Sequence, residues 1–170
     1  MKKILILGSS GSGKTYLGTI LSKRLHIKQY DLDDIHYKKK FEVVRTKKEK
    51  RRIMDKLTKK KSWIITGVRY SWMTAAIKRA DNIIILNRHP ILESYRVTKR
   101  WIKRKLGPNP PREKLKALYD LITWNYQAFH TKKGEHVIRH DKIIKNYTRK
   151  SIQINSSKEQ KKFLSKLRKE

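Results

Sequence analysis

One short stretch of the chain combines residue types and spacing suited to holding phosphate. It fits the phosphate-loop template of Gly, four residues, Gly, Lys, and then Ser or Thr. Glycines let the backbone curl until its N–H groups point at one anion, and the start of a helix adds partial positive charge. The residues expected to hold the phosphates of a nucleotide are Gly8, Ser9, Ser10, Gly11, Ser12, Gly13, Lys14 and Thr15. Lys14 would reach the outer phosphates as a catalytic residue, and the Thr15 hydroxyl would ligate Mg²⁺.

The residues on either side of this loop fit a turn from a strand into a helix. Residues 2–7 form a short apolar run suited to a buried strand, and apolar residues recur at helical spacing over about 14–25. An ordinary Gly/Ser turn before a helix is the alternative. Because every motif position is filled and both flanks are correct, the pattern favours a phosphate site.

A pair of carboxylates, Asp33 and Asp34, ends the next predicted strand, over about 26–34. The ligand crevice of a parallel α/β sheet lies at the carboxyl ends of its strands, so these acids would face the phosphate loop. Either could orient a substrate hydroxyl, accept its proton, or help to hold Mg²⁺ through water. The alternative is that they cap the segment that follows. We take both as candidate catalytic and substrate-binding residues.

An arginine follows the third predicted strand, over about 62–67. Arg69 stands beside Tyr70 and Trp72 at the same sheet edge as the phosphate loop, where a cation and aromatic rings could hold a substrate. Aromatic residues are more often part of a core, so we expect Trp72 to be packing. Arg69 is therefore the substrate-binding candidate of this segment.

A later helix, starting near Pro90, carries Arg96, Arg100 and Arg104 at four-residue intervals. This spacing places the three guanidinium groups on one face of the helix. Aimed at the crevice, they could neutralise charge that develops on a transferring phosphoryl group. In so basic a chain the same spacing also arises by chance.

The elements that must position these residues alternate between strands and helices, which predicts a parallel sheet. A fourth buried strand is expected over 83–86 and a last one over 151–155, with helices over about 71–80 and after Ser156. A Gly/Pro break at 107–111 separates two helices between those last strands. This arrangement has the form of a closing lid over about 96–130, or of a plain helical hairpin packed on the sheet.

The charge of the chain is unusual, because 45 Lys and Arg residues against 14 Asp and Glu residues give a formal net charge of +31. Residues 38–61 hold thirteen of the cations, and a capping-box pattern at 46–49 predicts a helix over about 47–60 with a solvated basic face. Such a field attracts nucleic acid, nucleotides or other phosphorylated molecules. The alternative is a solvated surface that is merely rich in lysine and has no specific ligand. The charge therefore indicates a polyanion without identifying it.

The length of 170 residues predicts one domain. Without cysteine, disulfides and cysteine-based zinc sites are excluded. The first strand begins at once and no apolar run approaches the ~20 residues that span a bilayer, so we expect a soluble cytoplasmic protein. His136 and His140 stand one helical turn apart, and without a third ligand nearby we interpret them as surface residues.

Taken together, these motifs resemble the small P-loop kinases related to adenylate kinase, and within them most closely the DNA topology modulation (FlaR-related) group. The resemblance rests on residues 8–15, 30–37, 63–73, 80–100 and 124–126, together with the final strand and helix. It implies a three-layer α/β/α P-loop NTPase fold, with a five-stranded parallel sheet in the order 2-3-1-4-5 and a helical lid that supplies arginines to an ATP site.

The resemblance also implies transfer of a γ-phosphoryl group from Mg-ATP to a small acceptor, such as a nucleoside or nucleotide, held near the basic segment at about 36–61. It strengthens Arg96 and Arg100 as catalytic candidates and points to Asn155 and Ser156 beside the adenine. Two positions depart from the family pattern, because Thr66 and Asn87 stand where acids are usual. Nucleotide-responsive binding of nucleic acid, and ATP hydrolysis without a specific acceptor, are the alternative functions.

Overall fold

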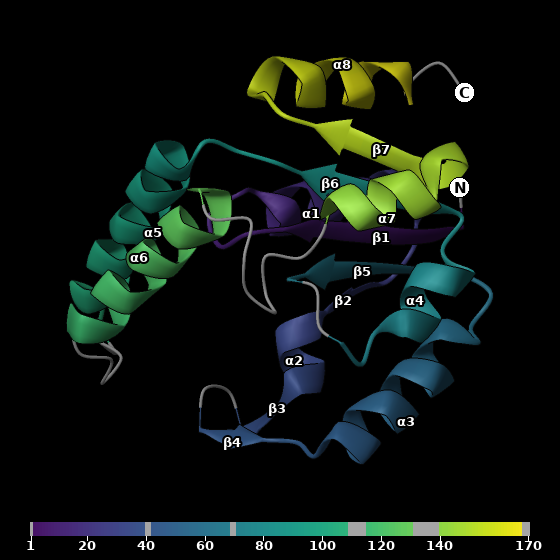
Figure 1. The fold of residues 1–170 in the computed structure, drawn as a ribbon, viewed down its shortest axis with the longest axis horizontal. Coiled ribbons are helices and arrows are strands. Elements are labelled where there is room, and N and C mark those ends of the chain that lie inside the picture. Colours follow the sequence, from purple (N-terminus) through teal and green to yellow (C-terminus); the bar gives the residue numbers. More distant parts are fainter. Residues whose placement is uncertain (1, 40–41, 69–70, 109–114, 131–139, 168–170) are drawn as a thin grey trace.

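The computed structural model describes residues 2–39, 42–68, 71–108, 115–130 and 140–167 (Figure 1). Within these residues no helix has the length and apolar character that crossing a membrane requires.

A parallel five-stranded sheet forms the centre of the molecule. Its spatial order is β2 (Gln29–Asp31), β5 (Trp63–Gly67), β1 (Lys3–Gly8), β6 (Asn82–Leu86) and β7 (Ser151–Ile154). All four neighbouring pairs run parallel. Counted along the chain within this sheet, the strands lie in the order 2-3-1-4-5, so the predicted topology is confirmed. Their carboxyl ends meet at one edge, where ligands bind in sheets of this type.

The central strand is buried on both faces, as its uninterrupted apolar sequence predicts. Ile4, Leu5, Ile6 and Leu7 are all fully buried. Because successive side chains of a strand point to opposite faces, Leu5 and Leu7 belong to one apolar cluster while Ile4 and Ile6 belong to the other. The sheet therefore needs helices on both sides.

Helices cover both faces and complete the three-layer α/β/α fold (Figure 1). On one face, α1 (Lys14–Leu25) and α8 (Ser157–Lys166) pack apolar side chains against the sheet. On the other face lie α3 (Lys47–Thr58), α4 (Thr74–Arg79) and α7 (His140–Asn146). A short 3₁₀ turn, η1 at 148–150, leads from α7 into β7.

Local capping signals place the starts of two helices where the sequence predicts them. Thr46 and Glu49 form a complete capping box at the start of α3, with Glu49 N–H donating to Thr46 Oγ1 over 3.2 Å. Ser156 Oγ accepts the N–H of Glu159 over 3.1 Å at the start of α8. The Ser156 hydroxyl therefore serves as the N-terminal cap of α8.

The second strand is shorter than the sequence analysis predicts. A strand over 26–34 is wrong, because β2 ends at Asp31 and residues Leu32–His36 form the helix α2. The Asp31 carboxylate accepts the N–H of Asp33 over 3.0 Å and so begins that helix. An antiparallel pair that the sequence analysis did not foresee follows, β3 (Tyr37–Lys39) and β4 (Val43–Val44).

Two long helices, α5 (Pro90–Lys105) and α6 (Leu115–His130), pack against each other and extend past the carboxyl edge of the sheet, on the left in Figure 1. Pro90 occupies the first turn of α5, as predicted. Of the Gly/Pro break at 107–111, residues 109–111 lie outside the described residues.

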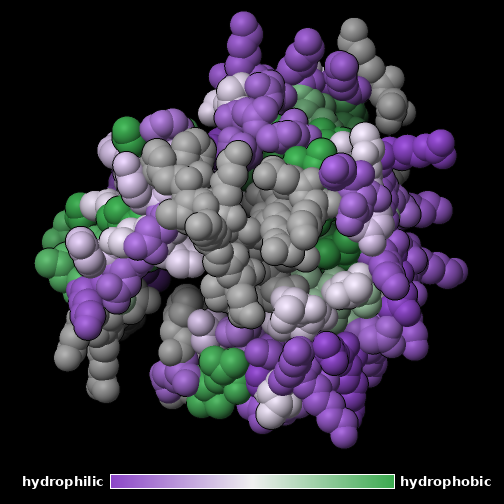
Figure 2. Space-filling model, in the orientation of Figure 1, coloured by the Kyte–Doolittle hydropathy of each residue, from purple (hydrophilic) through white to green (hydrophobic). Residues whose placement is uncertain are grey.

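The surface carries the excess of basic residues. Figure 2 shows hydrophilic side chains around much of the visible face. On α3 the exposed cations are Lys47, Lys48, Arg51, Arg52 and Lys56. Lys50 of the same helix is instead buried, with its ammonium 5.9 Å from the centre of the Trp72 ring. The basic face of α3 is therefore solvated, as predicted, without Lys50.

Candidate functional site

The loop between β1 and α1 has a backbone shape that favours glycine. Gly11 and Gly13 have φ angles of +84° and +93°, in the left-handed region that residues with a Cβ rarely adopt. A Cβ on Gly11 would lie 2.5 Å from the Glu93 carbonyl oxygen. Gly13 begins α1 without any side-chain cap, so the first N–H groups of this helix are offered to a ligand. This geometry fits a phosphate site.

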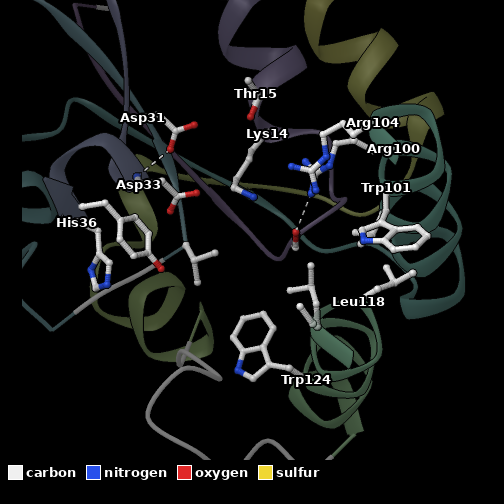
Figure 3. Close-up of a pocket in the computed structure, with 16 residues that line it drawn as sticks. Lys14, Thr15, Asp31, Asp33, His36, Arg100, Trp101, Arg104, Leu118 and Trp124 are labelled. Atoms are coloured by element: carbon white, nitrogen blue, oxygen red, sulfur yellow. Dashed lines mark hydrogen bonds between the residues drawn. The ribbon is translucent and has the colours of Figure 1, made fainter. Parts of the chain in front are cut away.

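Lys14 stands at the centre of the site. Its Nζ donates to the Ser9 carbonyl oxygen over 2.9 Å, and Figure 3 shows it pointing into the space between Asp33 and Arg100. Burial lowers the pKa of the Lys14 ammonium, and the nearby carboxylates of Asp31 and Asp33 oppose that shift. A phosphate bound beside Lys14 would bring a negative charge that favours the ammonium form and offsets the solvation lost on burial.

Carboxylates from the end of β2 form one wall. Asp31 and Asp33 both line a cleft beside the phosphate loop, whereas the exposed Asp34 does not line it. Burial raises the pKa of the Asp31 carboxyl group. Of the two predicted acids the structure therefore brings Asp33 to Lys14, and it adds Asp31, which the sequence analysis missed. Its position as the last residue of a strand was the available signal.

Arginines from α5 form the opposite wall. Arg100 and Arg104 line the cleft, and Arg100 Nη2 lies 3.4 Å from Ser10 Oγ. Arg96, one turn earlier, donates from Nη1 to the Gly11 carbonyl oxygen over 3.3 Å. The predicted common face is present, but Arg96 supports the phosphate loop from the side while the other two arginines face the cleft.

Two buried polar residues hold the loop, and the sequence analysis foresaw neither. Asn125 of α6 is 1% exposed and donates from Nδ2 to the Ser10 carbonyl oxygen over 2.9 Å. Glu93 of α5 is 2% exposed and accepts the Ser9 hydroxyl. Burial raises the pKa of Glu93 to about 7. Both lie in stretches that carry the family resemblance, but by residue type and spacing each is only a polar residue within an amphipathic helix.

The cleft has a volume of about 900 Å³ and a mixed lining. Its charged groups gather near the phosphate loop, and its aromatic and apolar groups come from α2, β3, α5 and α6 (Figure 3). Besides the charged residues already described, the principal lining side chains are His36, Tyr37, Trp101, Leu118, Leu121 and Trp124. Burial, together with Lys50, lowers the pKa of His36. One molecule with a charged part and a flat apolar part matches this lining.

The remaining predicted site residues lie elsewhere or are not described. Asn155 and Ser156 follow β7 at the same sheet edge, outside the lining of this cleft, and the Asn155 N–H donates to Glu159 Oε2 over 2.8 Å. Arg69 and His136 lie outside the described residues. Trp72 is 6% exposed and packs in the core, as expected.

The two positions that depart from the pattern of the resembled kinases differ in burial. Thr66 is fully buried at the end of β5, and its hydroxyl accepts Gln29 Nε2 over 3.3 Å. Asn87 is exposed, and its backbone N–H donates to the Ile154 carbonyl oxygen over 3.1 Å. Thr66 has no charge to offer a metal. The carboxylates among the residues that line the cleft are those of Asp31 and Asp33.

Sequence comparison gives a partial match. No protein-family model matches the chain. The uncharacterized protein YqaC of Bacillus subtilis strain 168 is 40% identical over 72 residues, which are 42% of this chain and 40% of YqaC. The matched stretch thus spans less than half of either protein.

Structural comparison gives matches along almost the whole chain. A shikimate kinase from Bacteroides thetaiotaomicron has a TM-score of 0.53 at 16% identity, covering 98% of this chain and 96% of that chain. A shikimate kinase from Acinetobacter baumannii in complex with shikimate has a TM-score of 0.55 at 18% identity, with 96% and 91% covered. A gluconokinase from Sinorhizobium meliloti 1021 has a TM-score of 0.53 at 13% identity, with 92% and 83% covered. The chain therefore has the fold of small P-loop kinases.

Proposed function

We propose that this protein is a Mg-ATP-dependent phosphotransferase that transfers the γ-phosphoryl group to a small acceptor, a nucleoside or a nucleotide. The observation that carries the proposal is the cleft in which Lys14 lies between carboxylates from the end of β2 and arginines from α5. Phosphoryl transfer depends mainly on positioning and charge stabilisation, and these groups supply both. The fold shared with shikimate kinases and a gluconokinase is consistent with this chemistry.

The phosphate loop would bind the donor. The uncapped N–H groups at the start of α1 and the Lys14 ammonium would hold the phosphates, and the Thr15 hydroxyl, which lines the cleft, would ligate Mg²⁺. The metal would neutralise charge on the phosphate oxygens. The carboxylates of Asp31 and Asp33 lie together on one side of the cleft and would hold water ligands of the Mg²⁺ ion. The loop after β7, with Asn155 and Ser156, would border the adenine.

The acceptor would lie between α2 and the α5–α6 pair. Asp33, or Asp31 beside it, would orient the acceptor hydroxyl and take its proton. Asp31 replaces Asp34 as the second candidate for this role, because Asp34 is exposed and does not line the cleft. The rings of Tyr37 and Trp124 offer flat surfaces suited to a nucleobase. Arg69, predicted to hold the substrate, stays a candidate.

The arginines of α5 would stabilise the transition state. Arg100 and Arg104 face the cleft, where their guanidinium groups would neutralise the equatorial oxygens of the transferring group. Arg96 would act by holding the Gly11 carbonyl and thereby the loop.

The deciding experiment is a transfer assay with γ-labelled ATP and a panel of acceptors: nucleosides, nucleotides, shikimate, gluconate, 5′-hydroxyl oligonucleotides and water. We expect labelled product with nucleosides or nucleotides, and loss of at least 100-fold in activity for Lys14→Ala, as is typical when a charge-stabilising group is removed. Lys23→Ala, an exposed lysine of the same helix, is the matched control and should retain full activity. Activity of Lys14→Ala equal to that of the control would refute the assignment, and label in water alone would indicate an ATPase.

A second candidate function, nucleic-acid binding in the manner suggested by the resemblance to topology modulation proteins, is favoured by the exposed cations of α3. Binding through this face predicts a log affinity that falls linearly with log salt concentration. Reversing Lys48 and Arg51 to Glu should weaken binding more than reversing Lys161 and Lys162 of α8, which changes the net charge equally. Equal weakening would show that binding follows only the total charge.

A further inference from the structure

The phosphate loop is held from outside by a buried acid. Glu93 lies in the first turn of α5, is 2% exposed, and accepts the hydroxyl of Ser9, the second residue of the loop. Two residues further along the loop, Gly11 packs against the backbone of Glu93 so closely that a Cβ would overlap the Glu93 carbonyl oxygen. The backbone and side chain of one residue therefore support the first half of the loop.

The charges that face Glu93 come from several elements. Lys14 approaches from α1, Arg96 from the next turn of α5, and Arg88 from the segment after β6. Arg88 is 2% exposed and donates to the Gln160 side chain of α8, while its Nε and Nη1 have no hydrogen-bond partner in the described part of the chain. Even with these three cations in range, burial outweighs them and raises the pKa of Glu93 to about 7.

A carboxylate in this position opposes the ligand that the loop is built to hold. The phosphates of ATP would bring several negative charges to the loop, and Lys14, which now offsets part of the Glu93 charge, would turn to them. In a buried setting this repulsion is poorly screened, so the neutral carboxyl form is favoured once phosphate is bound. A neutral Glu93 still accepts the Ser9 hydroxyl, so the support of the loop is kept.

We propose that Glu93 is a positioning residue for the phosphate loop and that nucleotide binding is accompanied by uptake of a proton from solvent by its carboxyl group. This inference rests on the proposed binding of ATP. The Glu93 carboxylate gains the proton, no other bond forms or breaks, and Ser9 keeps its hydrogen bond. ATP affinity then falls as pH rises above neutrality, because more of the free protein must be protonated on binding.

The test is calorimetric titration of the full chain with Mg-ATP at pH 7.5 to 8 in two buffers of different ionisation enthalpy, which counts the protons taken up per ATP bound. We expect the wild type to take up on the order of half a proton, and its Kd to rise up to about tenfold per pH unit. Glu93→Gln keeps an acceptor for Ser9 and should show neither effect. Because the phosphates of ATP titrate equally in both proteins, the difference between them isolates Glu93.

Ser9→Ala gives a second, independent readout. The Ser9 hydroxyl lowers the pKa of Glu93, so its removal should move the window of proton uptake to higher pH. Equal proton uptake by the wild type and Glu93→Gln would overturn the proposal, and so would an unshifted window in Ser9→Ala. If Glu93→Gln does not fold, the proposal is tested by comparing the pH range of proton uptake in the wild type with that in Ser9→Ala. ATP binding without proton uptake refutes this inference alone, whereas no ATP binding refutes the proposed function as well.

Discussion

Gly11→Ala is the substitution whose consequence the structure defines most sharply. The residue has a φ of +84°, and an added Cβ would lie 2.5 Å from the Glu93 carbonyl oxygen and 3.0 Å from its Cα. These neighbours are backbone atoms of α5, so no side chain can rotate away. Either the loop or the start of the helix must move by at least about 0.5 Å to accept the methyl group.

Two separate effects contribute to the loss of unfolding free energy in Gly11→Ala. A left-handed backbone at a residue with a Cβ costs about 1–2 kcal/mol. Overpacking against a fixed neighbour adds about 1–3 kcal/mol. We therefore expect Gly11→Ala to lower the free energy of unfolding by about 2–5 kcal/mol, a large part of the total for a domain of this size. ATP affinity should fall as well, because the displaced atoms belong to the phosphate loop.

Two other glycines provide a graded series. Gly13 has a φ of +93° but its Cβ would meet nothing closer than 3.7 Å, so Gly13→Ala tests the backbone effect alone and should cost about 1–2 kcal/mol. Gly107, after α5, has neither a positive φ nor a contact under 3.4 Å, so Gly107→Ala should change stability by about 0.5 kcal/mol or less.

Urea unfolding of the three variants, followed by tryptophan fluorescence, measures the series. The expected order of midpoints is Gly107→Ala highest, then Gly13→Ala, then Gly11→Ala. Equal midpoints for Gly11→Ala and Gly13→Ala would refute the reasoning, because contact with α5 would then contribute nothing to the requirement for glycine.

Three further outcomes follow from the site. The pKa of Glu93 is raised from 4.5 to about 7, so the contribution of this group to folding stability is present below pH 4.5 and is lost as pH rises through 7. Glu93→Gln should therefore be up to roughly 3 kcal/mol more stable than the wild type at pH 8 and similar to it at pH 4.5. Thermal unfolding at the two pH values measures the difference. Asn125→Ala removes the donor to Ser10 and should lower the free energy of urea unfolding by about 1–3 kcal/mol; an unchanged midpoint would contradict the contact. Arg104→Ala should lower kcat/KM by about 10-fold or more in the transfer assay, whereas Lys103→Ala, exposed and outside the cleft lining, should not.

Much of the fold is readable from local sequence. The apolar run before Gly8 predicts a strand buried on both faces, and the capping box at 46–49 predicts the start of α3; both are found. The order of the five strands came from the resemblance to P-loop kinases and is also confirmed. The end of β2 was placed wrongly, because Asp31 forms a cap whose geometry depends on the backbone of Asp33, a detail that residue type alone does not fix.

The candidate site likewise contains residues that local sequence predicts and residues that it does not. Lys14 and Thr15 are set by a contiguous motif, and both line the cleft. Helical spacing placed Arg96, Arg100 and Arg104 on one face of their helix, but it did not say what that face meets. Arg96 satisfied the same spacing yet lies against Gly11, because the helix crosses the loop at that turn.

The sequence by itself determined parts of this protein whose atoms are neighbours along the chain: the phosphate loop, the buried central strand and the caps of α3 and α8. Tertiary structure alone decided which distant residues support that loop. Ser9 meets Glu93 across 84 residues, and Ser10 meets Asn125 across 115. Such contacts depend on how α5 and α6 pack at the sheet edge, and a polar residue in an amphipathic helix carries no local mark of the partner that packing will give it.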